Sequence, residues 1–261
     1  ITSVREEKEN REIASRRYFH MSFVTHQSQQ EKAVPLVYRL HRWFFAICIV
    51  LGIGATLVLV ATSPQYYSLQ NGIASMVATF ATANTAMLQA HLLSGVFAVY
   101  LLPVSLLTMA WLAMRRSPWL ASIVLLVVFI GIVPVAAFSA QDALTFDLTH
   151  MGSNPFSVTI AQQFNDDGVM SYYNAMFLLG TVVAPMLVGV ALWRTRVIPI
   201  WAAILITFSR LLVFLYPFIQ SSIPSVYLQL LSWLLLFIGS LPAALAMLKV
   251  PSNESGGAVN K

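Results

Sequence analysis

Six long apolar runs occupy most of this chain of 261 residues, and only one of them contains an Arg, Lys, Asp or Glu. A helix needs about 20 residues to cross a bilayer core of about 30 Å, and the runs are of that length. The chain is 58% hydrophobic and 10% charged, whereas soluble domains carry about 25% charged residues. Lipid cannot satisfy a bare backbone, so the runs predict helices, and barrel strands would instead show short alternating segments. We therefore predict an all-α integral membrane protein with six transmembrane helices.

The predicted domain organisation follows from the positions of these runs. The six spans are Trp43–Ala61, Met87–Met114, Trp119–Phe138, Val169–Trp193, Ile198–Ile219 and Pro224–Leu248. They form one predicted transmembrane domain over residues 43–248, preceded by a cytoplasmic segment (1–42) and followed by a flexible cytoplasmic tail (249–261). Residues 1–20 are charged and have two interpretations: they belong to the protein, or they are an extension ahead of a natural start at Met21.

Basic residues lie on one side only of the predicted spans. They are Arg39, Arg42, Arg115, Arg116, Arg194, Arg196 and Lys249. The connections 62–86, 139–168 and 220–223 contain no Lys or Arg. The positive-inside rule then places both termini in the cytoplasm of a bacterial cell, with the spans in the plasma membrane. The net charge of +5 reports this orientation and forms no stripe on a soluble face, so we expect no nucleic-acid partner.

Arg210 is the one charged residue inside a predicted span. It lies about 12 residues into the fifth run, roughly 18 Å deep at 1.5 Å per residue, where a cation costs at least a few kcal/mol. One interpretation is a structural arginine satisfied by carbonyls, water or a loop aspartate. The other is an arginine that faces an outward-opening cavity and holds an anion. The possible counter-ions in the connection 139–168 are Asp142, Asp147, Asp166 and Asp167.

Further polar residues lie at the ends of two spans on the predicted outer side. They are Gln89, His91, Tyr172, Tyr173 and Asn174. The conservative interpretation is a hydrogen-bonded histidine and interfacial aromatic anchors. The alternative is that these residues line the same ligand-binding vestibule as Arg210. One histidine in the spans does not provide a pair of haem ligands, and one cysteine, Cys48, forms no multi-cysteine metal site, so we expect no cofactor and no metal.

The two long connections on the predicted outer side carry weaker signals. Residues 62–86 are uncharged, and their second half, from Ile73, is compatible with an interfacial or partly re-entrant helix. Residues 139–168 are interpreted as a solvated acidic loop. Asp147 and His150 would share one face if this loop were locally helical, which is a weak indication of a divalent metal site.

Prolines and small residues inside the spans concern helix packing. The prolines are Pro103, Pro134, Pro185 and Pro242, which predict kinks or, alternatively, broken helices that line a site. Small residues four apart are Gly52/Thr56, Gly180/Ala184 and Gly239/Ala243, which permit close helix contact.

Three functional hypotheses remain open at this point. The first is a protein that binds or transports a small anionic or amphipathic ligand, or a lipid, in an outward-facing pocket. The second is an accessory subunit that packs through its small-residue faces in a homo- or hetero-oligomer. The third is a membrane enzyme that uses His91 as an acid or base. The chain contains no nucleophile elbow, Walker loop, metalloprotease helix or dinucleotide fingerprint, so a non-enzymatic role is favoured.

The region around the fourth and fifth spans resembles a known family. The residues that carry the resemblance are Gly180–Ala184, Val188, Gly189 and the basic turn Arg194–Trp201 with its Ile-Pro-x-Trp sequence. They are similar to an uncharacterised bacterial six-span membrane family, the domain of unknown function 4386 type. That family is expected to carry a basic residue where this chain has Ile200. The resemblance implies a six-span fold and a bacterial membrane, and it assigns no catalytic or binding residue.

Overall fold

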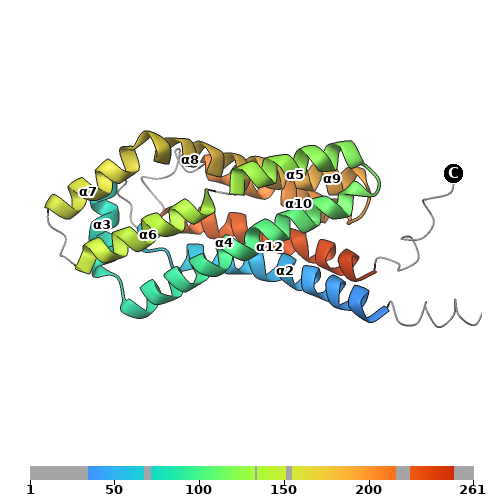
Figure 1. Ribbon diagram of the computed structural model, residues 1–261, viewed down its shortest axis with the longest axis horizontal. Coiled ribbons are helices and arrows are strands. Elements are labelled where there is room, and N and C mark those ends of the chain that lie inside the picture. The colour runs from blue at the N-terminus through green and yellow to red at the C-terminus, as the bar shows by residue number, and fades with distance from the viewer. Residues whose placement is uncertain (1–34, 68–71, 133, 151–154, 216–223, 250–261) are drawn as a thin grey trace, which may run out of the picture. The chain divides into compact units, whose positions relative to one another are not determined.

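The computed structural model describes residues 35–67, 72–132, 134–150, 155–215 and 224–249, and all regular structure in these ranges is helical (Figure 1). The all-α prediction is confirmed. The chain divides into two units, residues 1–43 with 250–261, and Phe44–Lys249. The second unit contains the helical bundle. The predictions for residues 1–34, including Met21, for the tail 250–261 and for residues 216–219 fall outside the described residues.

Five helices are long and apolar enough to cross a membrane. They are α2 (Pro35–Ala61), α4 (Thr85–Met114), the consecutive α5 (Pro118–Ile132) and α6 (Val135–His150), the stretch Gly168–Arg194 that contains α8 (Gly168–Leu178) and α9 (Ala184–Arg194), and α12 (Ser225–Lys249). The fifth predicted span is represented by a shorter apolar stretch, α10 (Ile200–Ser209) and the 3-10 turn η3 (Arg210–Leu215). The protein is therefore a membrane-embedded helical bundle.

Both long connections contain helices. The helix expected from Ile73 is confirmed as α3 (Ile73–Thr82), which follows the 3-10 turn η1 (Pro64–Tyr67). The acidic loop expected over residues 139–168 is wrong, because α6 extends to His150 and α7 covers Pro155–Asp166. The physical reason is a shared apolar cluster of Val77, Leu148 and Ala161, which gives α3, α6 and α7 something to bury. Figure 1 shows these three helices together at one end of the bundle.

Glycines allow the helices of the bundle to approach closely. A Cβ added at Gly180 would lie 2.2 Å from the carbonyl oxygen of Gly131, and one added at Gly52 would lie 2.1 Å from Ser105 Oγ. A Cβ added at Gly239 would lie 3.0 Å from the Ala202 carbonyl oxygen of α10. The three small-residue pairs noted in the sequence therefore each place a glycine in a contact inside the bundle.

Candidate functional site

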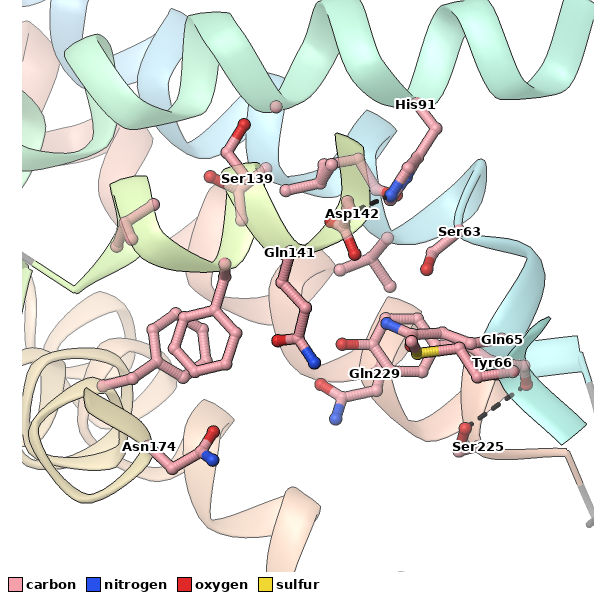
Figure 2. A pocket seen from close by; sticks show the side chains of 18 of the residues that line it. Ser63, Gln65, Tyr66, His91, Ser139, Gln141, Asp142, Asn174, Ser225 and Gln229 are labelled. Atoms are coloured by element: carbon pink, nitrogen blue, oxygen red, sulfur yellow. Dashed lines mark hydrogen bonds and ion pairs between the residues drawn. The ribbon is translucent and has the colours of Figure 1, made fainter. Parts of the chain in front are cut away.

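A cavity of about 650 Å³ lies between α2, η1, α3, α4, α6, α7, α8, η3 and α12. Five side-chain amides contribute to its wall: Gln65, Gln141, Asn165, Asn174 and Gln229. Figure 2 shows the amide ends of Gln141, Asn174 and Gln229 directed into the same space. An amide offers both hydrogen-bond donors and acceptors, so these side chains can bond to polar groups inside the cavity.

Arg210 contributes the permanent positive charge of the cavity wall. It stands where α10 passes into η3, and only 4% of its surface is exposed. Its Nε–H donates to the Thr181 carbonyl and one Nη1–H donates to Ser232 Oγ, both at 2.9 Å. The Trp233 ring lies 4.2 Å from the guanidinium carbon. Each of these partners is neutral, and among the described residues no carboxylate forms an ion pair with Arg210.

The sequence of the fourth span explains why the Thr181 carbonyl is available. Residues Leu179–Val183 form a π-helical turn, in which the Ala184 N–H reaches back five residues to the Leu179 carbonyl. Pro185 has no N–H, so the carbonyl of Thr181, four residues earlier, lacks its α-helical donor. Arg210 supplies the missing donor. π-helical turns of this kind are frequent at functional sites.

His91 and Asp142 form a second polar centre in the same wall. His91 is 2% exposed, and its Nε2 lies 3.2 Å from Asp142 Oδ2. Its Nδ1 lies 3.0 Å from the Leu59 carbonyl, which can only accept a hydrogen bond, so Nδ1 carries a proton. The Phe80 ring packs edge-on against the imidazole. These contacts tie α4 to α2, α3 and α6.

Tyr66 lies within electrostatic reach of both charged centres. Its backbone carbonyl accepts a hydrogen bond from Ser225 Oγ, which anchors η1 to α12. Burial of the phenol, and then the nearby negative Asp142, raise the pKa of Tyr66 above its usual value of 10.0, while Arg210 acts in the opposite direction. At neutral pH Tyr66 therefore keeps its O–H.

Ser63 adds an unsatisfied group to the cavity wall. Among the described residues, its hydroxyl oxygen is the one buried side-chain polar atom without a hydrogen-bond partner. Buried polar groups are normally paired, because an unpaired one costs about 1–3 kcal/mol. An occupant with a polar group of its own would provide the missing partner.

The structure brings only some of the predicted residues together. Arg210, His91, Asn174 and Asp142 line the cavity, and Asp142 contacts His91 rather than Arg210. The remaining predicted residues are outside the lining: Gln89, Tyr172, Asp147, Asp166 and Asp167 are exposed, and Tyr173 is half-buried. Asp167 caps α8 by accepting a hydrogen bond from the Val169 N–H.

The contributions of α12 and of the η1 region to the cavity wall were not predicted from the sequence. Ser225, Gln229, Ser232 and Trp233 repeat at helical spacing within an otherwise apolar run. Such a polar stripe on a spanning helix normally faces the protein interior, so this signal was available. No recognisable motif contains Ser63, Gln65 or Tyr66. They line the cavity because of the position that η1 takes in the folded protein.

The fold and the cavity define a membrane-embedded helical bundle with a polar, arginine-containing cavity. Comparisons with protein-family models, with curated proteins and with solved structures found no match.

Proposed function

We propose that this protein binds a small organic anion in the cavity that contains Arg210. The observation that carries the proposal is a buried guanidinium whose described partners are all neutral. A cation held away from water without a counter-charge is costly. An anion that enters the cavity supplies that charge, and hydrogen bonds between ionised partners are roughly twice as strong as neutral ones.

The chemistry of the wall narrows the class of ligand. A volume of about 650 Å³ is within the range of about 300–1,000 Å³ typical of small-molecule sites. The amides and the unpaired Ser63 hydroxyl favour an anion that also carries hydroxyl or carbonyl groups. We propose that such a hydroxylated carboxylate or phosphate ester is sensed or transported.

The proposal includes a topology. In this topology the apolar stretch Ile200–Leu215 belongs to a sixth crossing, which keeps both termini in the cytoplasm of a bacterial cell. The cavity is built from the end of α2, the starts of α4 and α12, the end of α8, and Arg210 directly after α10. The basic turns at 115–116 and 194–196 lie at the opposite helix ends, so the cavity faces outward. The family resemblance supports six spans and stays a prediction.

The topology is tested by labelling introduced cysteines in intact bacterial cells with a membrane-impermeant maleimide. Thr82→Cys, at the exposed end of α3, is expected to react without lysis, whereas Arg194→Cys should react only after lysis. The native Cys48 is buried and is replaced by Ala as background control. Equal labelling of both positions in intact cells would contradict the topology.

The anion site is tested by thermal unfolding of the purified protein in mild detergent. The probes are gluconate, glycerol 3-phosphate, benzoate and inorganic phosphate. We expect gluconate, glycerol 3-phosphate or both to raise the unfolding temperature of the wild type. Arg210→Gln should weaken the binding of these anions by about 10- to 100-fold, because a charge-assisted hydrogen bond is lost. Arg194→Gln, at an exposed arginine outside the cavity, should bind like the wild type. Equal binding by Arg210→Gln would overturn the assignment.

A membrane enzyme is the second candidate, and the His91–Asp142 contact favours it. A carboxylate hydrogen-bonded to one ring nitrogen is a common way to orient a histidine that acts as acid or base, and Asp142 lies 3.2 Å from His91. Anion binding that survives His91→Gln, with no turnover of the bound probe by the wild type, would argue for a binding protein instead.

The accessory-subunit hypothesis loses its main sequence argument. Its basis was the small-residue pairs, and Gly52, Gly180 and Gly239 each contact another helix of the same chain. Crosslinking in mild detergent tests what remains of this hypothesis, because a subunit should co-purify with its partner.

A further inference from the structure

The hydrogen-bond geometry of His91 and Asp142 requires a proton between them. With Nδ1–H donated to Leu59, a neutral imidazole would present the lone pair of Nε2 to Asp142. A lone pair facing an ionised carboxylate is repulsive. The 3.2 Å contact is favourable only if one proton lies on Nε2 or on the carboxyl group. In both arrangements the pair as a whole is neutral.

The proton therefore decides the net charge of the cavity. With the proton in place, the pair contributes nothing and Arg210 leaves the cavity with one positive charge. Without the proton, Asp142 is negative and balances Arg210 across the cavity that both residues line. Without an anion, the cavity is neutral when the pair has lost its proton. With a monovalent anion beside Arg210, the cavity is neutral when the pair holds its proton. Low polarity inside a bundle favours the neutral combination.

We propose that the His91–Asp142 pair is a proton-binding site linked to the anion site: the anion binds to the protonated pair that the 3.2 Å contact describes, and a pair that has lost its proton takes one up when the anion binds. This inference rests on the proposed function and adds a coupled ion to it. The proton moves from solvent to the pair, and no other bond changes. Because linkage is reciprocal, the anion also tightens the binding of the proton.

Among the described residues, the other titratable groups that line this cavity are Tyr66 and Arg210. Leu59 of α2 and Phe80 of α3 contact the imidazole and are not titratable. Arg210 stays charged, and Tyr66 keeps its phenolic proton at neutral pH. The proton between His91 and Asp142 is thus the one that decides the net charge of this wall.

The linkage is tested by measuring proton uptake from a weakly buffered detergent solution with an indicator dye. Gluconate, which has no group that titrates near neutral pH, serves as the probe for the proton count, and glycerol 3-phosphate serves as a second probe of affinity only, because its own phosphate exchanges a proton at about pH 6. We expect the affinity of the wild type to fall as pH rises, by up to about tenfold per pH unit for one linked proton, and proton uptake to approach one per probe anion in the pH range where the affinity falls. Asp142→Asn keeps a hydrogen-bonding partner for His91 and should bind the anion with no proton uptake.

Two exposed residues outside the cavity provide matched controls. Asp147→Asn and His150→Gln should show the wild-type proton count. Anion binding by the wild type with an affinity that does not depend on pH, and with no proton uptake at any pH, would overturn the linkage and leave the proposed function intact. No binding of either probe at any pH would overturn the proposed function, and the linkage with it. If Asp142→Asn does not fold, the wild-type proton count decides the question.

Discussion

Two regions of the bundle differ in how they use the space between helices. Around α5, α9 and α10 the backbones nearly touch: an added Cβ would lie 2.2 Å from its neighbour at Gly131, and also at Gly189, which faces Thr207. Around Arg210 the helices instead enclose a polar cavity of about 650 Å³. The first region contributes stability through packing, and the second retains polar groups that packing alone would have excluded.

The two regions meet within one turn of helix. Gly180 contacts the backbone of α5, and the next residue, Thr181, presents its carbonyl to Arg210. The close helix contact therefore determines where the acceptor of the buried cation lies. The tightly packed region therefore orients the cavity wall. A substitution that disturbs this packing should also weaken anion binding, whereas a substitution in the cavity should leave the packing intact.

The largest effect is expected from Gly131→Ala. The added methyl would lie 2.2 Å from backbone atoms of Gly180, which cannot rotate away as a side chain can. We expect a loss of about 3 kcal/mol or more in thermal unfolding, together with loss of anion binding, because Thr181 moves. Gly168→Ala is the control, since a Cβ there meets nothing within 4 Å. Equal unfolding temperatures for the two variants would contradict the tight contact.

A smaller effect should separate two arginines that each donate to a carbonyl. Arg116 donates to the Thr195 carbonyl at 2.9 Å, which ties α5's start to the end of α9. Arg116→Met should lower stability by about 1 kcal/mol. Arg210→Met should change the stability of the ligand-free protein by less than this, because removal of an uncompensated buried cation offsets the loss of the hydrogen bond to the Thr181 carbonyl. Guanidinium-chloride or thermal unfolding of both variants checks this order, and the reverse order would make Arg210 structural.

A still smaller effect is expected for the buried serines of α4. Ser105 Oγ lies within hydrogen-bond distance of the Cys48 carbonyl on α2 and of the Leu101 carbonyl of its own helix, whereas Ser94 Oγ donates to the His91 carbonyl of its own helix. Ser105→Ala should cost about 0.6 kcal/mol, the average for hydrogen bonds between membrane helices. Ser94→Ala should cost less, since no second helix is involved. A larger loss for Ser94→Ala in thermal unfolding would show that the cavity end depends on this hydroxyl.

The smallest effect concerns Tyr66 and appears only in alkali. Its pKa in the folded protein is raised above 10.0, so the unfolded phenol ionises first as pH rises. The stabilising contribution is complete below pH 10 and is lost as pH rises through the folded pKa. Tyr66→Phe should therefore lose less stability above pH 10 than the wild type. Tyr227→Phe, at an exposed position of α12, leaves Tyr66 in place and should retain the wild-type profile in alkaline unfolding.

Long-range placement explains why only part of the site was predictable. Arg210 and His91 stood out because charged or ionisable residues are rare in apolar runs. Asp142 was proposed as a counter-ion of Arg210, but α6 is helical here and brings it against His91. Tyr172 and Tyr173 share a span with Asn174, yet only Asn174 lines the cavity. Helix rotation decides such differences, and no residue pattern near these positions states it.

The sequence by itself determined the class of this protein. Apolar runs long enough to span a bilayer predict helices, because lipid cannot hydrogen-bond to an exposed backbone. The basic residues in the loops then predict the orientation of these helices. The sequence also predicted the helix that begins at Ile73. The rest followed from chain segments far apart in sequence: Pro185 frees a carbonyl, and Arg210, 25 residues later, occupies it.

Only the tertiary structure decided what surrounds Arg210 and which aspartate meets His91. The physical reason is that hydrophobicity acts on whole segments and is nearly independent of partner, so it can be read along the chain. A hydrogen bond acts over about 3 Å and depends on the orientation of both groups. The partners of Arg210 and His91 are therefore set by how the helices pack, after the runs have already made them helices.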